Sequence, residues 1–490
     1  MYRPSNPQIP MFDARGLLPQ EKRERAQRTW AEAFRLNAVP ILRRVEDEFA
    51  DLFDPEVGRP NRPVELVLGV LILKEMNDYT DEEALDALEW NGLWWWAFQR
   101  QPEELHLCQK TLHNFRRGVI EHDKSKVAFR RVTDELIAAL GIQVGKQRLD
   151  STHVLSNFAI VNRLGLFCET IRVFLRAVKA VDAKAYAALP AGILRRHGDE
   201  DNYAYARRGE GPRRLAVVAR DVGRLIERFQ KNPRVARTEE WALLRRLFDE
   251  QCEIAERPQR PAADDDDLDD GAAAVTLKEP KEVGSDSLQT PHDPDVTYSG
   301  HKGKGYSVQV AETCVEGDEV RIITEVAVTP ACESDARATV PMVVALEVAG
   351  QKPDEVVADT GYSGAKIAAD LAKMEVNLTA PAPAAAKPDP GQEYGAPAPA
   401  CPTRPVDAAK WLQQQEAAAD FRERYAIRAG IESTNSELKR GHGLRKLRVR
   451  GGLRVRLAVY FKALACNLKR ALRHWTQGLA GEAEAAAARG

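Results

Sequence analysis

Residues 356–362 read VVADTGY, a short apolar run closed by an aspartate and a glycine turn. The small and β-branched residues before Asp359 predict a buried strand, 355–358, that ends at this carboxylate. Gly361 lets the chain turn sharply just beyond it. Because ligand sites of open α/β sheets lie beyond the carboxyl ends of strands, Asp359 is a candidate site residue.

The segments around this strand alternate between helix and strand patterns. A helix is predicted near 338–348, a second near Lys366, and a strand over 376–379. Upstream, apolar and polar residues alternate over 306–313, and 321–328 follows as the second arm of a hairpin. This order predicts a mixed sheet flanked by helices.

The first strand of this sheet is predicted far upstream, over 143–154 (QVGKQRLDSTHV). It carries Asp150 in its interior, where carboxylates are disfavoured. Helical periodicity returns over 158–256, so a long helical insertion interrupts the sheet. Residues 20–145 also read as helical, with a capping box at 80–83. A helix-turn-helix DNA reader and a plain helical bundle both fit this N-terminal region.

The composition, 44% hydrophobic and 29% charged residues, is typical of a globular protein with polar linkers. The first thirty residues lack the apolar core of a secretory signal. The longest apolar run, 64–73, is far shorter than the roughly 20 residues that span a bilayer. Seven scattered cysteines without a CxxC pair favour reduced thiols over disulfides or structural zinc. We therefore expect a cytoplasmic protein.

The formal net charge of −2 hides a strong segregation of charge. Residues 264–270 (DDDDLDD) are acidic, whereas 421–474 hold fifteen Lys and Arg against three Glu. Basic helices are often only solvated faces, but an asymmetry of this size favours a polyanionic partner. The expected partner is nucleic acid.

The basic region contains YAIRAGIESTNSELK, residues 425–439. On one helix, Tyr425, Arg428, Glu432 and Lys439 would share a face, which sets a carboxylate among two cations and a phenol. A plain alternative is a surface ion pair between Glu432 and Arg428, worth about 0.3–0.5 kcal/mol. Gly430 inside this helix costs about 1 kcal/mol relative to Ala. It indicates either a close approach of the backbone to DNA or to the sheet, or a local irregularity.

Asp150 and Asp359 also have structural alternatives. Asp359 could cap the turn that follows it, and Asp150 could pair with Arg148 or a neighbouring strand. Together with Glu432, however, carboxylates without His or Cys favour hard cations such as Mg²⁺ or Mn²⁺. Two such ions can activate the attacking oxygen and stabilise the leaving oxygen of a phosphoryl transfer. Beside a basic region, this chemistry indicates cutting of a nucleic-acid backbone.

These motifs resemble the DDE transposases of bacterial insertion sequences, in the branch with a Y-(2)-R-(3)-E-(6)-K signature. The tetrad in 425–439 matches that signature without a gap. The three catalytic regions of the family resemble LDSTHVLSN around Asp150, ADTGYSG around Asp359, and RAGIEST…LKRGHGLRKLRVRGG around Glu432. The family's second strand resembles 293–314, and the closing motif of its N-terminal helical domain resembles KTLHNFR, 110–116.

The resemblance implies a ribonuclease-H-like core, with the first Asp on the first strand, the second Asp after the fourth, and the Glu on a later helix. It implies two Mg²⁺ or Mn²⁺ ions held by the catalytic residues Asp150, Asp359 and Glu432. The residues that it implies as contacts to DNA phosphates are Tyr425, Arg428 and Lys439. Further candidates for DNA contact, from their closeness to the motifs, are Thr360, Lys302 and Lys304.

The implied function is that of a transposase, which binds the terminal inverted repeats of an insertion sequence, cuts the DNA and joins the freed 3′ ends to a target. A homodimer is expected on DNA, because two ends must be brought together. The alternatives are an inactive or repurposed DNA-binding derivative and a nuclease that cuts without strand transfer. Relatives often carry a cysteine cluster where residues 380–406 are rich in Pro and Ala, so the role of this loop is open.

The expected fold class is α+β, a helical domain followed by the ribonuclease-H-like core. The predicted parts are an N-terminal helical domain that binds DNA ends (1–140), the start of the core (141–157), a helical insertion (158–256), an acidic, Pro-rich flexible linker (257–300), the remainder of the core with basic C-terminal helices (301–475), and a disordered tail (476–490).

Overall fold

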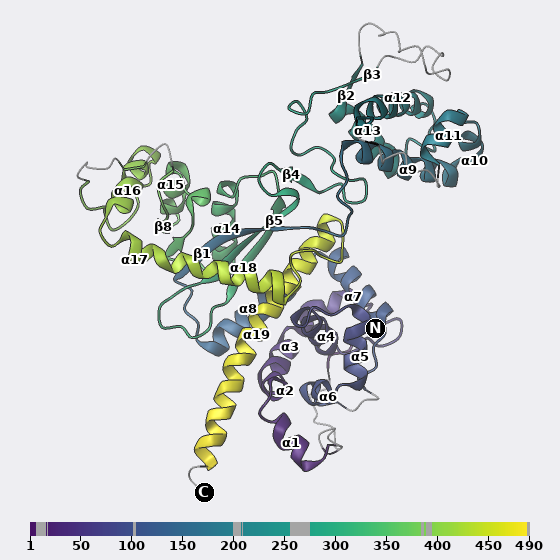
Figure 1. Cartoon of the computed structure of the whole chain (residues 1–490). Coiled ribbons are helices and arrows are strands. Elements are labelled where there is room, and N and C mark those ends of the chain that lie inside the picture. The colour runs from purple at the N-terminus through teal and green to yellow at the C-terminus, as the bar shows by residue number, and fades with distance from the viewer. Residues whose placement is uncertain are drawn as a thin grey trace.

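The computed structural model describes residues 1–5, 16, 18–100, 104–198, 207, 209–254, 275–383, 387–388 and 394–487. In Figure 1 a central sheet lies between groups of helices, and a further helical unit stands off from it at the upper right. The long last helix crosses the molecule and ends away from the sheet.

The central sheet has the order β6–β5–β1–β7–β8, and a short strand, β4, pairs with the start of β5. β5 runs antiparallel to β1 and β6, whereas β7 and β8 run parallel to β1. This mixed sheet within a largely helical chain confirms the predicted fold class. The bounds are β1 Lys146–Val154, β4 Thr297–Ser299, β5 Gly303–Thr313, β6 Ile323–Pro330, β7 Glu355–Val357 and β8 Asn377–Thr379.

The two faces of the sheet receive alternate side chains of each strand. Leu149 and Ala311 pack on one face in a core with residues of the helices α14 (Ala336–Val348), α15 (Ala365–Lys373) and α16 (Pro405–Ala417). Val154 and Val308 belong to the core on the other face, which includes the N-terminal helices and the last helix. Asp150 shares the second face with Val154, four residues further along β1.

The N-terminal helices do not have a core of their own. Their buried residues form one continuous cluster with β5, β6 and the last helix, so the predicted domain 1–140 packs together with the sheet. The capping box predicted at Thr80 is present and starts α5. The bounds are α1 Gln20–Ala26, α2 Trp30–Ala33, the π-helix Phe34–Ala38, α3 Val39–Val45, the 3₁₀ helix Glu46–Leu52, α4 Val64–Met76, α5 Asp81–Trp90, α6 Gly92–Phe98, α7 Gln109–Glu121 and α8 Val127–Leu140.

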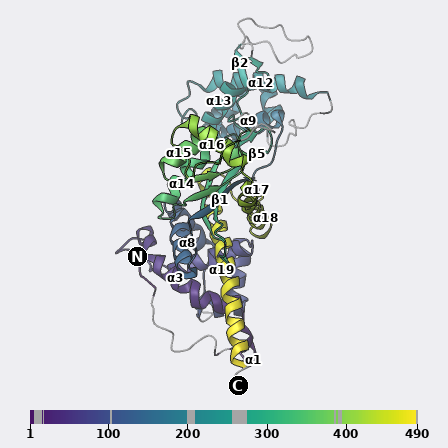
Figure 2. The ribbon, with the colours of Figure 1, turned by 90° about the vertical axis from the view of Figure 1, so that its left-hand side faces the viewer.

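The helical insertion has a separate core. Figure 1 shows it standing off from the sheet, and in Figure 2 it lies at the opposite end of the molecule from the N-terminal helices. It comprises α9 Arg163–Val181, α10 Ala183–Ala187, α11 Ala191–His197, α12 Gly211–Phe229 and α13 Glu239–Gln251, followed by a ribbon of β2 (Cys252–Ile254) and β3 (Val275–Leu277). The predicted linker 257–300 needs correction. Residues 255–274 lie outside the described residues, but 275–300 include β3, β4 and the buried Leu288 and Val296, because these apolar side chains complete neighbouring cores.

The C-terminal region differs from its prediction in two ways. Residues 425–439 do not form one helix, because a 3₁₀ turn, Ile427–Ala429, separates α17 (Phe421–Ala426) from α18 (Gly430–Gly441). The predicted disordered tail 476–490 is wrong over most of its length, since α19 runs from Gly452 to Ala487. Its last turns are rich in Ala and Glu, which favour helix. None of the described helices is long and apolar enough to cross a membrane.

Candidate active site

Asp150 lies on β1 with only 9% of its surface exposed. Its Oδ1 accepts a hydrogen bond from Arg428 Nη2 at 3.2 Å, and its Oδ2 accepts one from Asn435 Nδ2 at 2.9 Å. Burial raises the pKa of Asp150, and the charges of Asp359 and Asp335 add to the rise, while Arg428 opposes it. The carboxylate is therefore held at both oxygens in an environment that disfavours its charge.

Asp359 lies two residues beyond the end of β7, at the carboxyl edge of the sheet. Its Oδ1 accepts a hydrogen bond from the backbone N–H of Gly361 at 2.8 Å and caps the 3₁₀ turn Thr360–Tyr362. Its Oδ2 accepts a hydrogen bond from Arg428 Nη2 at 3.3 Å. Asp359 therefore caps the turn, as one of the two alternatives predicted, and the same carboxylate also contacts Arg428. Its role in a metal site stays a prediction.

Glu432 lies in the first turn of α18, with 65% of its side chain exposed. Its Oε1 accepts a hydrogen bond from Arg428 Nη1 at 2.8 Å. Arg428, in the 3₁₀ turn between α17 and α18, thus contacts carboxylates from a strand, a strand end and a helix. We call Asp150, Asp359, Glu432 and Arg428 the carboxylate cluster.

The carboxylate cluster sets three negative groups against one guanidinium. The contacts of Arg428 to the two aspartates, 3.2 and 3.3 Å, exceed the roughly 2.7–2.9 Å of strong charge-assisted hydrogen bonds. Its Nε is buried and has no hydrogen-bond partner among the described residues. One guanidinium therefore contacts all three carboxylates but offsets only part of their negative charge.

The position of α18 depends on a second set of charges next to the first. Arg148, two residues before Asp150 on the same face of β1, donates to Glu312 Oε2 through Nε at 2.8 Å and Nη2 at 2.5 Å. Thr434 Oγ1 and Arg470 Nη1 each donate to Glu312 Oε1 at 2.5 Å. We call Arg148, Glu312, Thr434 and Arg470 the closed network. Arg148 is thus engaged elsewhere, and the alternative that it pairs with Asp150 is wrong.

The closed network also explains Gly430. Arg148 Nη1 donates to the carbonyl oxygen of Ile427 at 2.7 Å, so its guanidinium lies against the start of α18. A Cβ on Gly430 would overlap that guanidinium. The close approach that the sequence suggested is therefore to a side chain of the sheet.

The cations predicted to contact DNA divide into two groups. Lys302 Nζ donates to Ser151 Oγ at 3.0 Å, beside Asp150, and lies 3.7 Å from Asp335. Burial lowers the pKa of Lys439, and the charges of Lys302 and Arg445 lower it further. These cations are near one another at one side of the carboxylate cluster.

Lys304 lies elsewhere. Its Nζ donates to the carbonyl oxygens of Val161 at 2.9 Å and Gln289 at 3.4 Å, so it ties the start of the insertion to the sheet. The structure does not bring it to the cluster, because these contacts hold its ammonium group beside the insertion. Tyr425 is half-buried and stacks on Phe421, with ring centroids 5.4 Å apart, and Thr360 is exposed beside Asp359.

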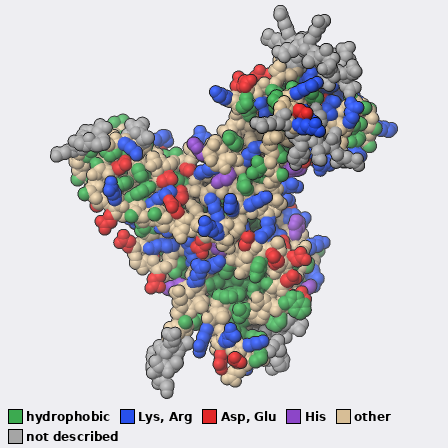
Figure 3. Space-filling model, viewed as in Figure 1, with side chains coloured by type: hydrophobic (Ala, Val, Ile, Leu, Met, Phe, Trp, Pro, Cys, Tyr) green, Lys and Arg blue, Asp and Glu red, His purple; other side chains and the backbone are tan. Residues whose placement is uncertain are grey.

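The surface around the site is rich in cations. Figure 3 shows Lys and Arg side chains spread over the middle of the face that carries α17, α18 and the upper part of α19. Apolar side chains gather below them, over the N-terminal helices. A polyanion could follow the basic zone past the cluster.

Two residues at the site were missed from the sequence. Asn435 contacts Asp150, and its position three residues after Glu432 on one helix was a signal that could have found it. Asp335, at the start of α14, accepts hydrogen bonds from Ser151 Oγ and Gln309 Nε2, each at 2.9 Å. No motif marked Asp335, because only the packing of α14 on the sheet brings it near Asp150.

A second group of potential metal ligands lies behind α18, where donor atoms of Glu437, His442 and Cys466 are within 4.8 Å of one another. The carboxylate of Glu437 already accepts from Arg470 at 3.0 Å and Arg473 at 3.5 Å. Burial also raises the pKa of the Cys466 thiol to about 12, which keeps it protonated. Because two arginines already occupy Glu437 and the thiol stays protonated, we interpret this group as structural and not as a metal site.

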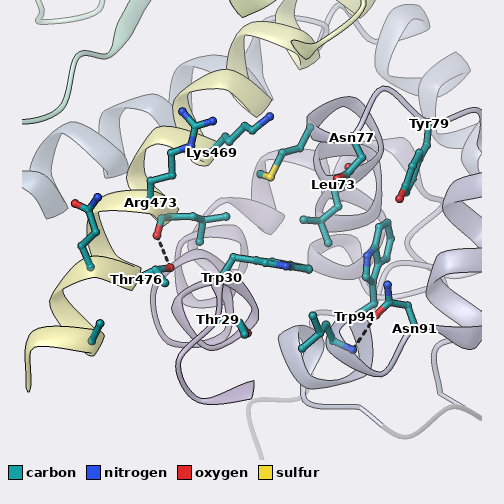
Figure 4. A pocket seen from close by; sticks show the side chains of 15 residues that line it. Thr29, Trp30, Leu73, Asn77, Tyr79, Asn91, Trp94, Lys469, Arg473 and Thr476 are labelled. Atoms are coloured by element: carbon teal, nitrogen blue, oxygen red, sulfur yellow. Dashed lines mark hydrogen bonds between the residues drawn. The ribbon is translucent and has the colours of Figure 1, made fainter. Parts of the chain in front are cut away.

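A hollow beside the C-terminal helix α19 is lined mainly by apolar atoms and does not include the carboxylate cluster. It measures about 700 Å³ and lies between the N-terminal helices and α19. Figure 4 shows Trp30, Trp94 and Tyr79 facing Lys469 and Arg473 across it. Trp94 is 2% exposed, so it is mainly a core residue whose edge reaches this wall.

A mixed sheet in which carboxylates from the first strand, the end of a parallel strand and a later helix converge defines a ribonuclease-H-like protein. Two family models match the chain, the Transposase DDE domain over residues 284–468 and the Transposase domain (DUF772) over 22–118. No curated protein and no solved structure matches it. The chain belongs to the DDE transposases of insertion-sequence type, a family that typically uses a divalent metal.

Proposed function

We propose that this transposase binds the terminal inverted repeats of an insertion sequence, cuts the DNA with two divalent cations, and joins the freed 3′ ends to a target. The observation that carries the proposal is the convergence of Asp150, Asp359 and Glu432, from three separate elements, on one guanidinium. Carboxylates that lie this close repel one another unless a positive charge offsets the repulsion. Arg428 supplies that charge here, and bound divalent cations would supply more of it.

The donors fit Mg²⁺ or Mn²⁺. The three carboxylates supply only oxygen ligands, and the unpaired oxygen of Asn435 lies beside them. Asp150, Asp359 and Glu432 would hold the ions. When bound, two ions supply activation of the attacking oxygen and stabilisation of the leaving oxygen in an in-line displacement.

Arg428 has two roles in this proposal. Without metal it neutralises part of the cluster. With metal and DNA it turns to a phosphate, where guanidinium binds in a bidentate manner. Its long contacts and its unpaired Nε support an exchangeable pairing. Tyr425 and Lys439 complete the signature Y-(2)-R-(3)-E-(6)-K, and we assign them, with Lys302 and Thr360, to the DNA backbone near the cut.

The remaining parts of the proposal concern assembly. The N-terminal helices bind the DNA ends, two chains assemble as a homodimer on two ends, and the protein acts in the cytoplasm, on the nucleoid. Light scattering of the purified chain with and without DNA ends tests the dimer. A monomer in the presence of saturating ends would contradict it.

The central test incubates the purified full chain with a labelled inverted-repeat end and Mg²⁺ or Mn²⁺. Joined products support the transposase. Cleavage without joining favours a nuclease, and binding without cleavage in either metal favours a repurposed DNA-binding protein.

Variants locate the site. Asp150→Asn, Asp359→Asn and Glu432→Gln should each abolish cleavage while end binding persists, and retained cutting removes that residue from the triad. Asp370→Asn is the matched control, since Asp370 is an aspartate of α15 paired only with nearby lysines in the described structure. Arg428→Ala should weaken end binding and reduce the salt dependence by about one counter-ion.

A further inference from the structure

Asn435 occupies a position on α18 where an apolar residue is expected. Its neighbours on the inward stripe, Ile431 and Leu438, are 0% and 1% exposed, and Asn435 itself is 8% exposed. A buried amide is costly unless its donor and acceptor are both used. The residue therefore needs an explanation from its partners.

Only half of this amide has a partner. Nδ2 donates to Asp150 Oδ2 at 2.9 Å, and since a carboxylate only accepts, the nitrogen must be the atom that faces it. Oδ1 is thereby fixed on the other side of the amide. It is buried and has no donor within the described residues.

The contacts of Asp150 are divided between two kinds of partner. Oδ1 is held by Arg428, whose pairing is long and incomplete, whereas Oδ2 is held by the neutral amide of Asn435. If Arg428 moved away, Asp150 Oδ1 would lose its partner while Oδ2 kept its hydrogen bond from Asn435. Asn435 would thus keep the carboxylate oriented when its counter-ion changes.

We propose that Asn435 is a fourth member of the cation site, with Nδ2 orienting Asp150 and Oδ1 serving as a neutral oxygen ligand to a divalent cation. The inference rests on the proposed function of the carboxylate cluster. Amide oxygens are ligands that hard cations accept. A neutral amide oxygen adds a metal ligand without adding negative charge to three carboxylates that already repel one another. This role also explains why Asn435 Oδ1 has no hydrogen-bond donor among the described residues.

The test measures binding of Mn²⁺ alone to the full chain, by electron paramagnetic resonance, in wild type and in an Arg428→Ala background. Asn435→Ala removes both the donor and the oxygen, and should weaken Mn²⁺ binding by about 10- to 100-fold. Asn435→Asp keeps the oxygen, loses the donor and adds a charge. If Oδ1 faces the cation, this variant should bind Mn²⁺ at least as tightly as wild type.

Ser433→Ala, at an exposed neighbour on the same helix, is the matched control and should bind like wild type. Circular dichroism of each variant shows that the helix content is kept. If Asn435→Ala misfolds, the isosteric Asn435→Asp still decides the question.

The outcomes separate the two levels of the proposal. Wild-type affinity in Asn435→Ala overturns the role of Asn435 while the triad stands. An Asn435→Asp variant as weak as Asn435→Ala, or weaker, overturns the ligand role, because the new charge then only repels Asp150. Absence of Mn²⁺ binding in wild type and in Arg428→Ala alike overturns the metal site itself, and with it the proposed function.

Discussion

The closed network and the carboxylate cluster lie side by side on β1 and α18 but follow opposite electrostatic designs. Glu312 is fully buried, and its two oxygens accept four hydrogen bonds, from Arg148, Thr434 and Arg470. The carboxylate cluster has an excess of negative charge, long contacts and an exposed member in Glu432.

This difference in charge balance indicates a structural role for the closed network and supports a ligand-binding role for the carboxylate cluster. A fully paired buried charge has nothing left to offer a ligand, and it costs much to break. A group of carboxylates whose negative charge is only partly offset is stabilised by any added cation. Adjacent residues of one strand face thus carry Arg148, which is fixed in the closed network, and Asp150, which belongs to the proposed cation site.

Breaking the closed network should have the largest effect on stability. Glu312→Gln leaves Arg148 buried without its counter-charge and leaves Arg470 with Glu437 as its remaining carboxylate partner. The free energy of unfolding should fall by about 3–5 kcal/mol. Urea denaturation monitored by circular dichroism measures it. Glu375→Gln, at an exposed carboxylate, is the control. A loss below about 1 kcal/mol would show that the network is less buried than its contacts indicate.

The pH dependence of stability tests whether water is excluded from His442, which lies behind α18. Burial lowers its pKa from 6.5 to about 4, so between these values the unfolded chain binds a proton that the folded chain does not. Stability should therefore fall as the pH drops from about 6.5 to about 4, by roughly 3 kcal/mol from this group at 1.4 kcal/mol per pKa unit.

The measurement for His442 compares unfolding free energies of wild type and His442→Gln across this pH range. Other groups titrate equally in both proteins, so the difference isolates the imidazole. Equal slopes for the two proteins would mean that His442 gains its proton in the folded chain as readily as in the unfolded one.

Filling the space at Gly430 should have an intermediate effect. Gly430→Ala would gain about 1 kcal/mol of helix propensity on an open helix, but here the new methyl group displaces the Arg148 guanidinium. We expect a net loss of about 1–3 kcal/mol, as in overpacked sites. Gly478→Ala, in α19 with no atom near its Cβ position, should not be destabilising. A stabilising Gly430→Ala would show that Arg148 moves freely.

Removing one charge from the carboxylate cluster should have the smallest effect on stability and abolish cleavage. Asp359→Asn relieves repulsion and loses one long contact to Arg428, so unfolding should change by less than about 1 kcal/mol. Denaturation and end-cleavage assays on the same sample measure both. A loss comparable to that of Glu312→Gln would make the cluster a structural network as well.

The sequence predicted much of this arrangement. The strands and their order follow from local periodicity, and the candidate triad follows from motifs around Asp150, Asp359 and Glu432. The 3₁₀ turn at Ile427–Ala429 was not predicted, because the contact between Arg148 and the carbonyl of Ile427 involves residues 279 positions apart. The helix of 476–487 was misjudged because an Ala-rich, polar end also fits disorder.

The sequence by itself determined which elements form and which side chains each of them carries, because capping and periodicity act over a few residues. Only the tertiary structure decided the partners. It joined Arg148 to Glu312, placed Arg428 against three carboxylates and bonded Lys304 to backbone carbonyls. Among the described residues it also left one oxygen of Asn435 without a hydrogen-bond partner. Those choices depend on how α18 packs across β1, and packing between distant segments balances burial and charge in ways that no local pattern records.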